Sequence, residues 1–140
     1  MAATDFINGG YAIPGADIPV KNTSGGALVA GTTVKLDTGN LLSATQPAVG
    51  VTTVSAVTDK CLGVLIEAAP INGIARCRVL GGVWAIAQAA ITAGSAVGAS
   101  TTAGQVIAYT ATDPYLGIAL TAAATAADPI LVLLQPGVTA

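Results

Sequence analysis

The chain has 140 residues, of which 53% are hydrophobic and 9% are charged, whereas about 25% of a typical soluble domain is charged. Its 5 basic and 7 acidic residues cannot cover the surface of a domain of this size, so the composition favours a protein whose neutral surface is largely buried against other subunits. The net charge of −2 argues against a nucleic acid as partner, and no apolar run approaches the roughly 20 residues of a membrane-spanning helix.

Residues 1–20 are predicted to form an extended N-terminal arm, because they contain Pro14 and Pro19 and take no part in the repeat of the later segments. They show no basic segment followed by an apolar one, so no secretory signal is expected. Phe6 and Tyr11 lie in this arm. Because only 4% of the chain is aromatic, we regard these two side chains as candidate contacts to a neighbouring protein.

Residues 21–140 are predicted to form a single all-β domain, a small β-sandwich or barrel-like fold of short strands. Apolar and polar residues alternate in residues 33–37 and 74–80, which is the period of a strand. The strands are separated by frequent turn signals, and Asn72-Gly73 is the strongest of them because both residues tolerate the positive φ of a hairpin turn. Residues 85–91 and 121–127 could instead form short helices, since their apolar spacing does not decide between the two structures.

Asp37 lies in the sequence Asp37-Thr38-Gly39, which matches the central motif of aspartic proteases. Those enzymes pair two carboxylates, and a dimer would supply the second one. Lys35 and Asn40 do not fit the residues around that motif. The favoured interpretation is therefore a turn, since Asp, Gly and Asn suit turn positions, and the dimeric protease is the enzymatic alternative.

The two cysteines, Cys61 and Cys77, are too few to define a disulfide framework. We interpret them as small buried thiols, and a bridge between them is the alternative. The chain has no His, which removes the commonest metal ligand and the usual base of nucleophilic catalysis. We therefore expect no catalytic residue, no metal site and no cofactor.

Three residues of the central segment are candidates for contacts. Arg76 and Arg78 are two positions apart, so they share one face of a strand. They form either a solvated face or a paired contact to the carboxylates of a partner. Trp84, the only Trp, is either a core residue or an anchor in an interface.

The chain repeats itself. The segment Ala27-Leu28-Val29-Ala30-Gly31-Thr32-Thr33-Val34 recurs as Ala90-Ile91-Thr92-Ala93-Gly94-Ser95-Ala96-Val97, and Leu62-Gly63-Val64 recurs as Leu116-Gly117-Ile118. The repeat predicts two similar β-rich halves, residues 21–83 and 84–140, that pack together.

The order of these motifs, over residues 20–135, resembles the capsid decoration (cement) proteins of bacteriophages. The resemblance rests on aliphatic and small residues, namely Leu62-Gly63-Val64, Gly82-Val83, Ile91-Thr92-Ala93-Gly94, Thr102-Ala103-Gly104-Gln105-Val106, Leu116-Gly117-Ile118-Ala119-Leu120 and Ile130-Leu131-Val132-Leu133.

The resemblance implies a non-enzymatic virion protein, made in the host cytoplasm and docked on the outer surface of a phage shell. Such a protein stabilises the shell by bridging subunits of the major capsid protein, and it associates with itself, with a trimer favoured. Phe6, Tyr11, Arg76, Arg78 and Trp84, singled out above, are the candidate contacts to the capsid or to another subunit. The structural alternative is another virion or cell-surface β protein, such as a head-fibre base, a tail component or an adhesin module.

Overall fold

The computed structural model describes residues 15–42, 48–110 and 112–135, and these residues form nine strands and no helix. The predicted all-β class is therefore confirmed, and neither segment that could have been helical forms a helix. The strands are β1 (Ala16–Asn22), β2 (Thr33–Leu36), β3 (Val49–Thr53), β4 (Cys61–Leu65), β5 (Ile74–Ile86), β6 (Ala96–Ala99), β7 (Val106–Ala108), β8 (Gly117–Ala119) and β9 (Pro129–Leu134).

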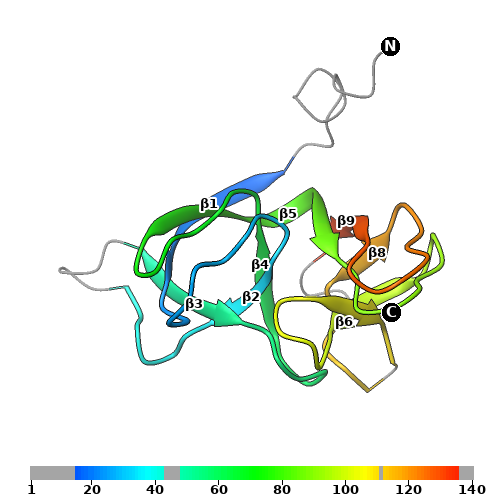
Figure 1. Ribbon diagram of the computed structural model, residues 1–140, viewed down its shortest axis with the longest axis horizontal. Helices are drawn as coiled ribbons and strands as arrows, with labels where there is room; N and C mark the ends of the chain where they lie inside the picture. Colours follow the sequence, from blue (N-terminus) through cyan, green and yellow to red (C-terminus); the bar gives the residue numbers. More distant parts are fainter. Residues whose placement is uncertain (1–14, 43–47, 111, 136–140) are drawn as a thin grey trace, which may run out of the picture.

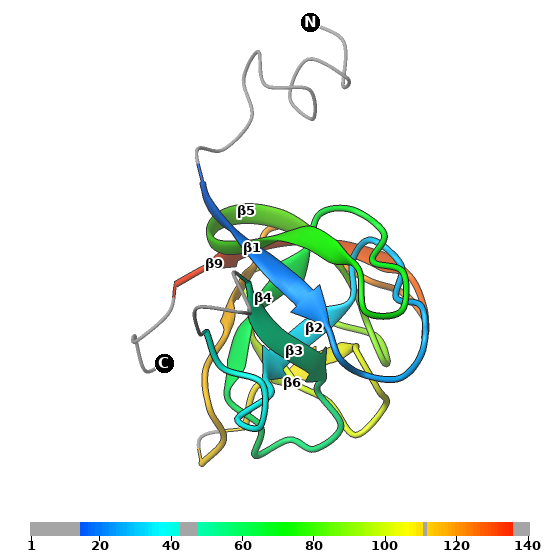
Figure 2. The same ribbon diagram turned by 90° about the vertical axis from the view of Figure 1, so that its left-hand side faces the viewer.

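The first five strands close into a barrel. Their order around it is β1-β3-β2-β4-β5, and a pairing between β1 and β5 completes the circle. The pairing of β1 with β3 is parallel and the other four are antiparallel. Figure 2 looks towards this first barrel, with β1 crossing in front of it. Closure leaves the barrel no free edge on which another strand could pair.

The second part of the chain, which we call the second unit, repeats the same arrangement. The segment of β5 from Gly81 to Ile86 pairs with β9, and the order continues as β9-β8-β6-β7. Ala87, which directly follows β5, forms a parallel bridge with Val106 of β7. This bridge is the counterpart of the parallel pairing of β1 with β3 in the first barrel. The predicted internal repeat is therefore present in the strand pairings.

Strand β5 belongs to both units. Its residues up to Leu80 pair with β1, whereas those from Gly81 pair with β9. Figure 1 shows β5 passing from the first barrel into the neighbouring second unit. The change of partner lies between Leu80 and Gly81, near the expected boundary at residues 83 and 84. The expected arm of residues 1–20 overlaps β1, and its residues 1–14 lie outside the described residues, so the arm stays a prediction.

The side chains of β5 alternate between inside and outside, as the sequence pattern predicts. Ala75 and Cys77 point into the core of the first barrel, and Val83 and Ala85 point into that of the second unit. Each buried methylene contributes about 0.8 kcal/mol, so the small inner side chains of one strand help to stabilise two cores.

Two equivalent glycines explain part of the sequence repeat. Gly63 on β4 and Gly117 on β8 each face a carbonyl of the neighbouring strand, Arg78 on β5 and Leu133 on β9 respectively. A Cβ atom at either position would collide with that carbonyl group. Only glycine allows the two strands to approach so closely.

The two units are also joined away from β5. The Thr33 N–H donates a hydrogen bond to the Gly104 carbonyl (2.8 Å), and the Gly104 N–H donates one to the Val54 carbonyl (2.9 Å). Gly104 comes from the connection between β6 and β7, whereas Thr33 and Val54 belong to the first barrel. Val64 of β4 packs in the core of the second unit. These contacts hold the units in one orientation.

The turn at Asn72-Gly73 differs from the predicted two-residue hairpin. Asn72 does have a positive φ of 58°, but the connection between β4 and β5 comprises residues 66–73. The Gly73 N–H donates to the Pro70 carbonyl (2.8 Å), so Asn72 is the third residue of a four-residue turn at the end of that loop. The buried side chain of Asn22 supports the loop with bonds to the carbonyls of Ala69 and Pro70. No local sequence signal shows this distant support.

We expect the substitution Gly104→Ala to destabilise the protein by about 3 kcal/mol. Gly104 has a φ of +73°, and an added Cβ would lie 2.7 Å from Cγ2 of Thr32 at the contact between the units. Gly94→Ala is a matched control, because Gly94 has a φ of +87° and no atom within 4 Å of an added Cβ. It should cost only the backbone strain of about 1–2 kcal/mol. Urea unfolding of both variants measures the difference, and equal losses would contradict this account of the contact.

Candidate functional site

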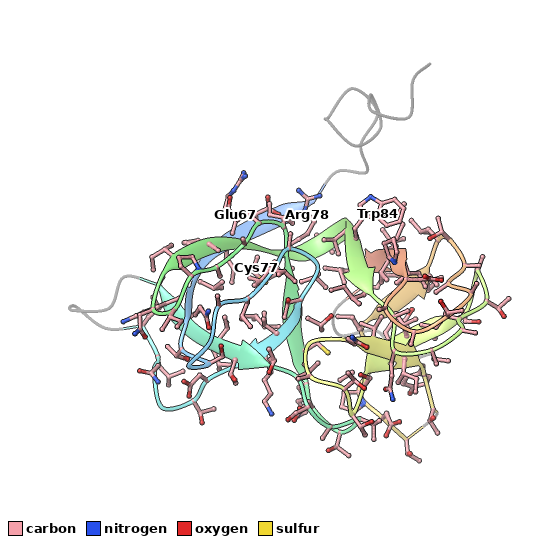
Figure 3. The ribbon with its side chains drawn as sticks, in the orientation of Figure 1. Glu67, Cys77, Arg78 and Trp84 are labelled. Atoms are coloured by element: carbon pink, nitrogen blue, oxygen red, sulfur yellow. The ribbon has the colours of Figure 1, made fainter. Side chains whose placement is uncertain are left out.

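The outer side of β5 collects the candidate residues of the described chain. Ile74, Arg76, Arg78, Leu80 and Trp84 occupy alternate positions that face away from the two cores. Figure 3 shows Arg78 and Trp84 along one side of the molecule, together with Glu67, whereas Cys77 lies inside the first barrel. The other two candidates, Phe6 and Tyr11, lie outside the described residues.

Arg78 is held within its own chain. Its Nε and Nη2 donate hydrogen bonds to the two carboxylate oxygens of Asp17 (2.8 and 3.3 Å), and its Nη1 donates to the Gly82 carbonyl (2.8 Å). Asp17 lies opposite Arg78 on β1. The hydrogen bond from Arg78 lowers the pKa of Asp17. Bidentate pairs of this kind fix geometry, so Arg78 ties β1 to β5.

Arg76 is more accessible to a partner. Its Nη2 lies 3.6 Å from Oε2 of Glu67, a long ion pair whose side chains are 63% and 43% exposed. The main link to Glu67 is made by the backbone, because the Arg76 N–H donates to Oε1 of Glu67 (2.8 Å). Exposed pairs of this kind contribute little to stability. The guanidinium of Arg76 can therefore turn to a carboxylate of another protein at small cost.

Trp84 belongs to a surface of six apolar residues that we call the apolar face. Trp84 is paired with Leu131, and Ile118 with Leu133, and paired side chains lie on the same side of a sheet. The Leu120 N–H donates to the Leu131 carbonyl (2.7 Å), which places Leu120 beside them. Leu80, Trp84 and Leu120 are 50%, 41% and 39% exposed. The apolar face comprises Leu80, Trp84, Ile118, Leu120, Leu131 and Leu133.

Sequence reasoning missed most of this face, although a signal was present. Strand β9 has the sequence Pro-Ile-Leu-Val-Leu-Leu, which is apolar on both sides. Ile130, Val132 and Leu134 point into the core, while Leu131 and Leu133 point outwards and are only partly buried. A strand with two apolar sides is usually covered on both. The same pattern was compatible with a fully buried strand, so it did not identify an outer surface.

Asp37 forms a turn, as the favoured interpretation predicts. Its carboxylate accepts hydrogen bonds from the Thr23 hydroxyl (2.6 Å), the Asn40 amide (2.7 Å) and the Gly39 N–H (3.1 Å), and its carbonyl accepts one from the Asn40 N–H (3.0 Å). The pKa of Asp37 is lowered, most strongly by the hydrogen bond from Thr23 and next by the hydrogen bond from Asn40. These three donors and the backbone bond to Asn40 are those of a local turn. The geometry thus uses Asp37 to hold a loop.

Cys61 and Cys77 are free thiols. Cys77 is fully buried, as predicted, whereas Cys61 is only partly buried. Burial raises the pKa of both thiols to about 12, so neither is a thiolate at neutral pH. They act as small apolar side chains that pack against the two cores.

The described residues contain no group of three or more Cys, Asp or Glu side chains placed to hold a metal ion. Nor do they include a helix of the length and hydropathy needed to cross a membrane. The strands present a largely neutral outer surface. The accessible cation Arg76 lies on β5, the strand that contributes Leu80 and Trp84 to the apolar face.

The comparison with known proteins shows a likeness to a solved structure. No family model and no curated protein matches the sequence. Among solved structures, the fold is similar to that of the N base of the head fibre protein gp8.5 of bacteriophage phi29, with a TM-score of 0.64 and 11% identity. The likeness covers 86% of this chain and 93% of the other. It establishes a common fold over nearly the whole of both chains.

We expect the protein to be less stable in acid, because protonation of Asp17 and Asp37 removes the stability that their carboxylates contribute. Both have a lowered pKa in the folded chain. Such a group contributes stability above its unfolded pKa of about 3.9, and this contribution is lost as the pH falls through the folded value. The Tm should therefore decrease between about pH 5 and pH 2. Asp37→Asn should be less stable at neutral pH but lose less Tm over this range. Parallel curves for the variant and the unmodified protein would contradict the assignment.

Proposed function

We propose that this protein is a structural component of a bacteriophage virion that attaches to the outer surface of the phage head. The observation that carries the proposal is the fold shared with the phi29 head-fibre base over most of both chains. The composition supports it independently, because a neutral surface of Thr, Ala, Gly and aliphatic residues suits broad contacts with other subunits. We assign the protein no catalytic activity.

A head-fibre base is the favoured form of this role. A cement protein that bridges subunits of the major capsid protein is the second candidate, which the motif resemblance supports. The two differ in their effect on the shell. A cement protein that binds only the assembled shell shifts the equilibrium towards it, whereas a fibre base needs only to be anchored.

We assign the contact with the head to the outer side of β5. Arg76 offers an exposed guanidinium on this side, and Trp84 offers a partly exposed aromatic ring of the kind that often anchors interfaces. Arg78 supports the surface indirectly, since its guanidinium is bound to Asp17 and Gly82. Phe6 and Tyr11 remain predicted contacts to the head or to a neighbouring subunit.

We further propose that the protein acts as a homo-oligomer, with a trimer favoured. The second unit supports this, because residues 79–140 contain no basic residue and only two acidic ones, Asp113 and Asp128. Such a surface offers little charge repulsion to a second copy. Several linked copies would attach to a head more firmly than one through multivalency.

The test is co-sedimentation of the purified protein with phage heads assembled without it. We expect the protein to pellet with the heads, and Arg76→Glu to reduce the bound amount, because it reverses the exposed charge of the contact side. Lys60→Glu is the matched control, since it makes the same charge change at an exposed position in the loop before β4. It should bind like the unmodified protein.

The thermal stability of the same heads separates the two candidates. A head-fibre base should leave the melting temperature of the shell unchanged, whereas a cement protein should raise it. A protein that stays in the supernatant at every concentration would contradict both.

A further inference from the structure

We propose that a second copy of this chain covers the β8 and β9 part of the apolar face, and that it does so with its first barrel. The contact repeats between two chains the contact that joins the two units within one chain. This inference rests on the proposed homo-oligomer and specifies its interface, and it does not depend on attachment to a phage head.

Backbone hydrogen bonds show which positions of the two units are equivalent. The Ile66 N–H, directly after β4, donates to the Arg76 carbonyl of β5 (3.1 Å). In the second unit the Leu120 N–H, directly after β8, donates to the Leu131 carbonyl of β9 (2.7 Å). Leu120 is therefore the counterpart of Ile66, and Leu131 is the counterpart of Arg76.

The first barrel shows what covers the surface around β4. Val64, which follows Gly63, is fully buried, and it packs with Ile66 against the core of the second unit. The counterparts of these two residues are less buried, since Ile118 is only partly buried and Leu120 is 39% exposed. A surface that the first repeat buries against a neighbouring unit is thus partly exposed in the second repeat.

The outer positions of β9 favour a contact that extends beyond β8. Leu131 has the position of the exposed Arg76, and Leu133 has that of Arg78, whose carbonyl faces the equivalent glycine. The first barrel therefore carries guanidinium groups where the second unit carries leucines. Apolar side chains at positions that one repeat exposes to water indicate that a partner covers the other repeat.

The first barrel of a second copy has the loop that this contact needs. Within one chain, the second unit reaches the first barrel through the loop between β6 and β7, which contains Gly104. The loop after β2 is its counterpart, because the Asp37 N–H donates to the Gly50 carbonyl (2.9 Å) as the Ser100 N–H donates to the Gln105 carbonyl (3.2 Å).

The described part of the loop after β2 carries two exposed apolar side chains. Leu41 and Leu42 are 51% and 63% exposed. The equivalent loop of the second unit bonds to Thr33 of β2. The counterpart of Thr33 is Ala96 of β6, which is paired with Ile118. A second copy that docks in the same way therefore brings Leu41 and Leu42 beside Ile118.

The contact joins two different surfaces, so it is heterologous, and a heterologous contact closes into a ring when the rotation between copies permits it. Strands β8 and β9 carry no charged residue, so the contact buries no unpaired charge on these strands. Arg76 and Trp84, on β5, remain at the side that we assign to the head.

Light scattering of the purified protein without heads tests the contact. The unmodified protein should have the mass of several chains, whereas Leu131→Arg and Leu42→Asp should each have the mass of one chain, 13.5 kDa. Leu131→Arg introduces the residue that the first barrel has at the equivalent position, so the fold accommodates it. Ile71→Asp is the control and should oligomerise normally, because Ile71 is 56% exposed in the loop before β5, outside both surfaces. Circular dichroism and the melting temperature check that each variant is folded.

An equimolar mixture of Leu131→Arg and Leu42→Asp distinguishes this contact from a symmetric one. The first variant keeps an intact loop and the second keeps an intact apolar face, so the mixture should form a dimer of one chain of each. A mixture that stays monomeric, or a Leu42→Asp variant that oligomerises like the unmodified protein, would overturn the proposal.

An unmodified protein that is monomeric at every concentration would overturn it as well. The sedimentation with heads is independent of this result. A monomer that still pellets with the heads contradicts only the contact between copies, whereas an oligomer that stays in the supernatant contradicts only the attachment.

Discussion

The structure depends on one strand that two units share. Neither the first barrel nor the second unit is complete without β5, whose first part pairs with β1 and whose second part pairs with β9. Its inner side chains reach both cores, so the strand must keep its pairing register on both sides of Gly81 over its 13 residues. The contact of Gly104 with the first barrel adds a second link. The two repeats are thus linked at two separate places.

The same constraint determines what the protein presents to its surroundings. Because the inner side of β5 is committed to the cores, its outer side presents side chains along both units, on either side of Gly81, which has a φ of 92°. Arg78 is used to fasten β1 to this strand, which leaves Arg76 and the apolar face for contacts with other molecules. This outer side offers an extended surface with exposed apolar side chains. That is what attachment to a large protein surface requires.

Much of the fold could be predicted from the sequence, because the repeat has local causes. Gly31 and Gly94 both adopt a positive φ, and the bridges of Leu28 with Ala69 and of Ile91 with Ala123 are equivalent. The closure of the barrel could not be predicted, since the parallel pairing of β1 with β3 has no local signal. The pair of Arg78 and Asp17 joins residues that are 61 positions apart, so alternation alone showed two arginines on one face without their partner. The apolar face stayed hidden because an outer side rich in leucine looks like a core.

We propose above that the protein attaches to a phage head through the outer side of β5. Cryo-electron microscopy of heads saturated with the protein measures this directly, because the shape of two adjoining units fixes their orientation. We expect density for both units on the outside of the shell, with Arg76 and the apolar face turned towards the shell or towards neighbouring copies. Density in which this side of β5 faces solvent, while the loop before β4 that contains Asp59 and Lys60 contacts the shell, would contradict the claim.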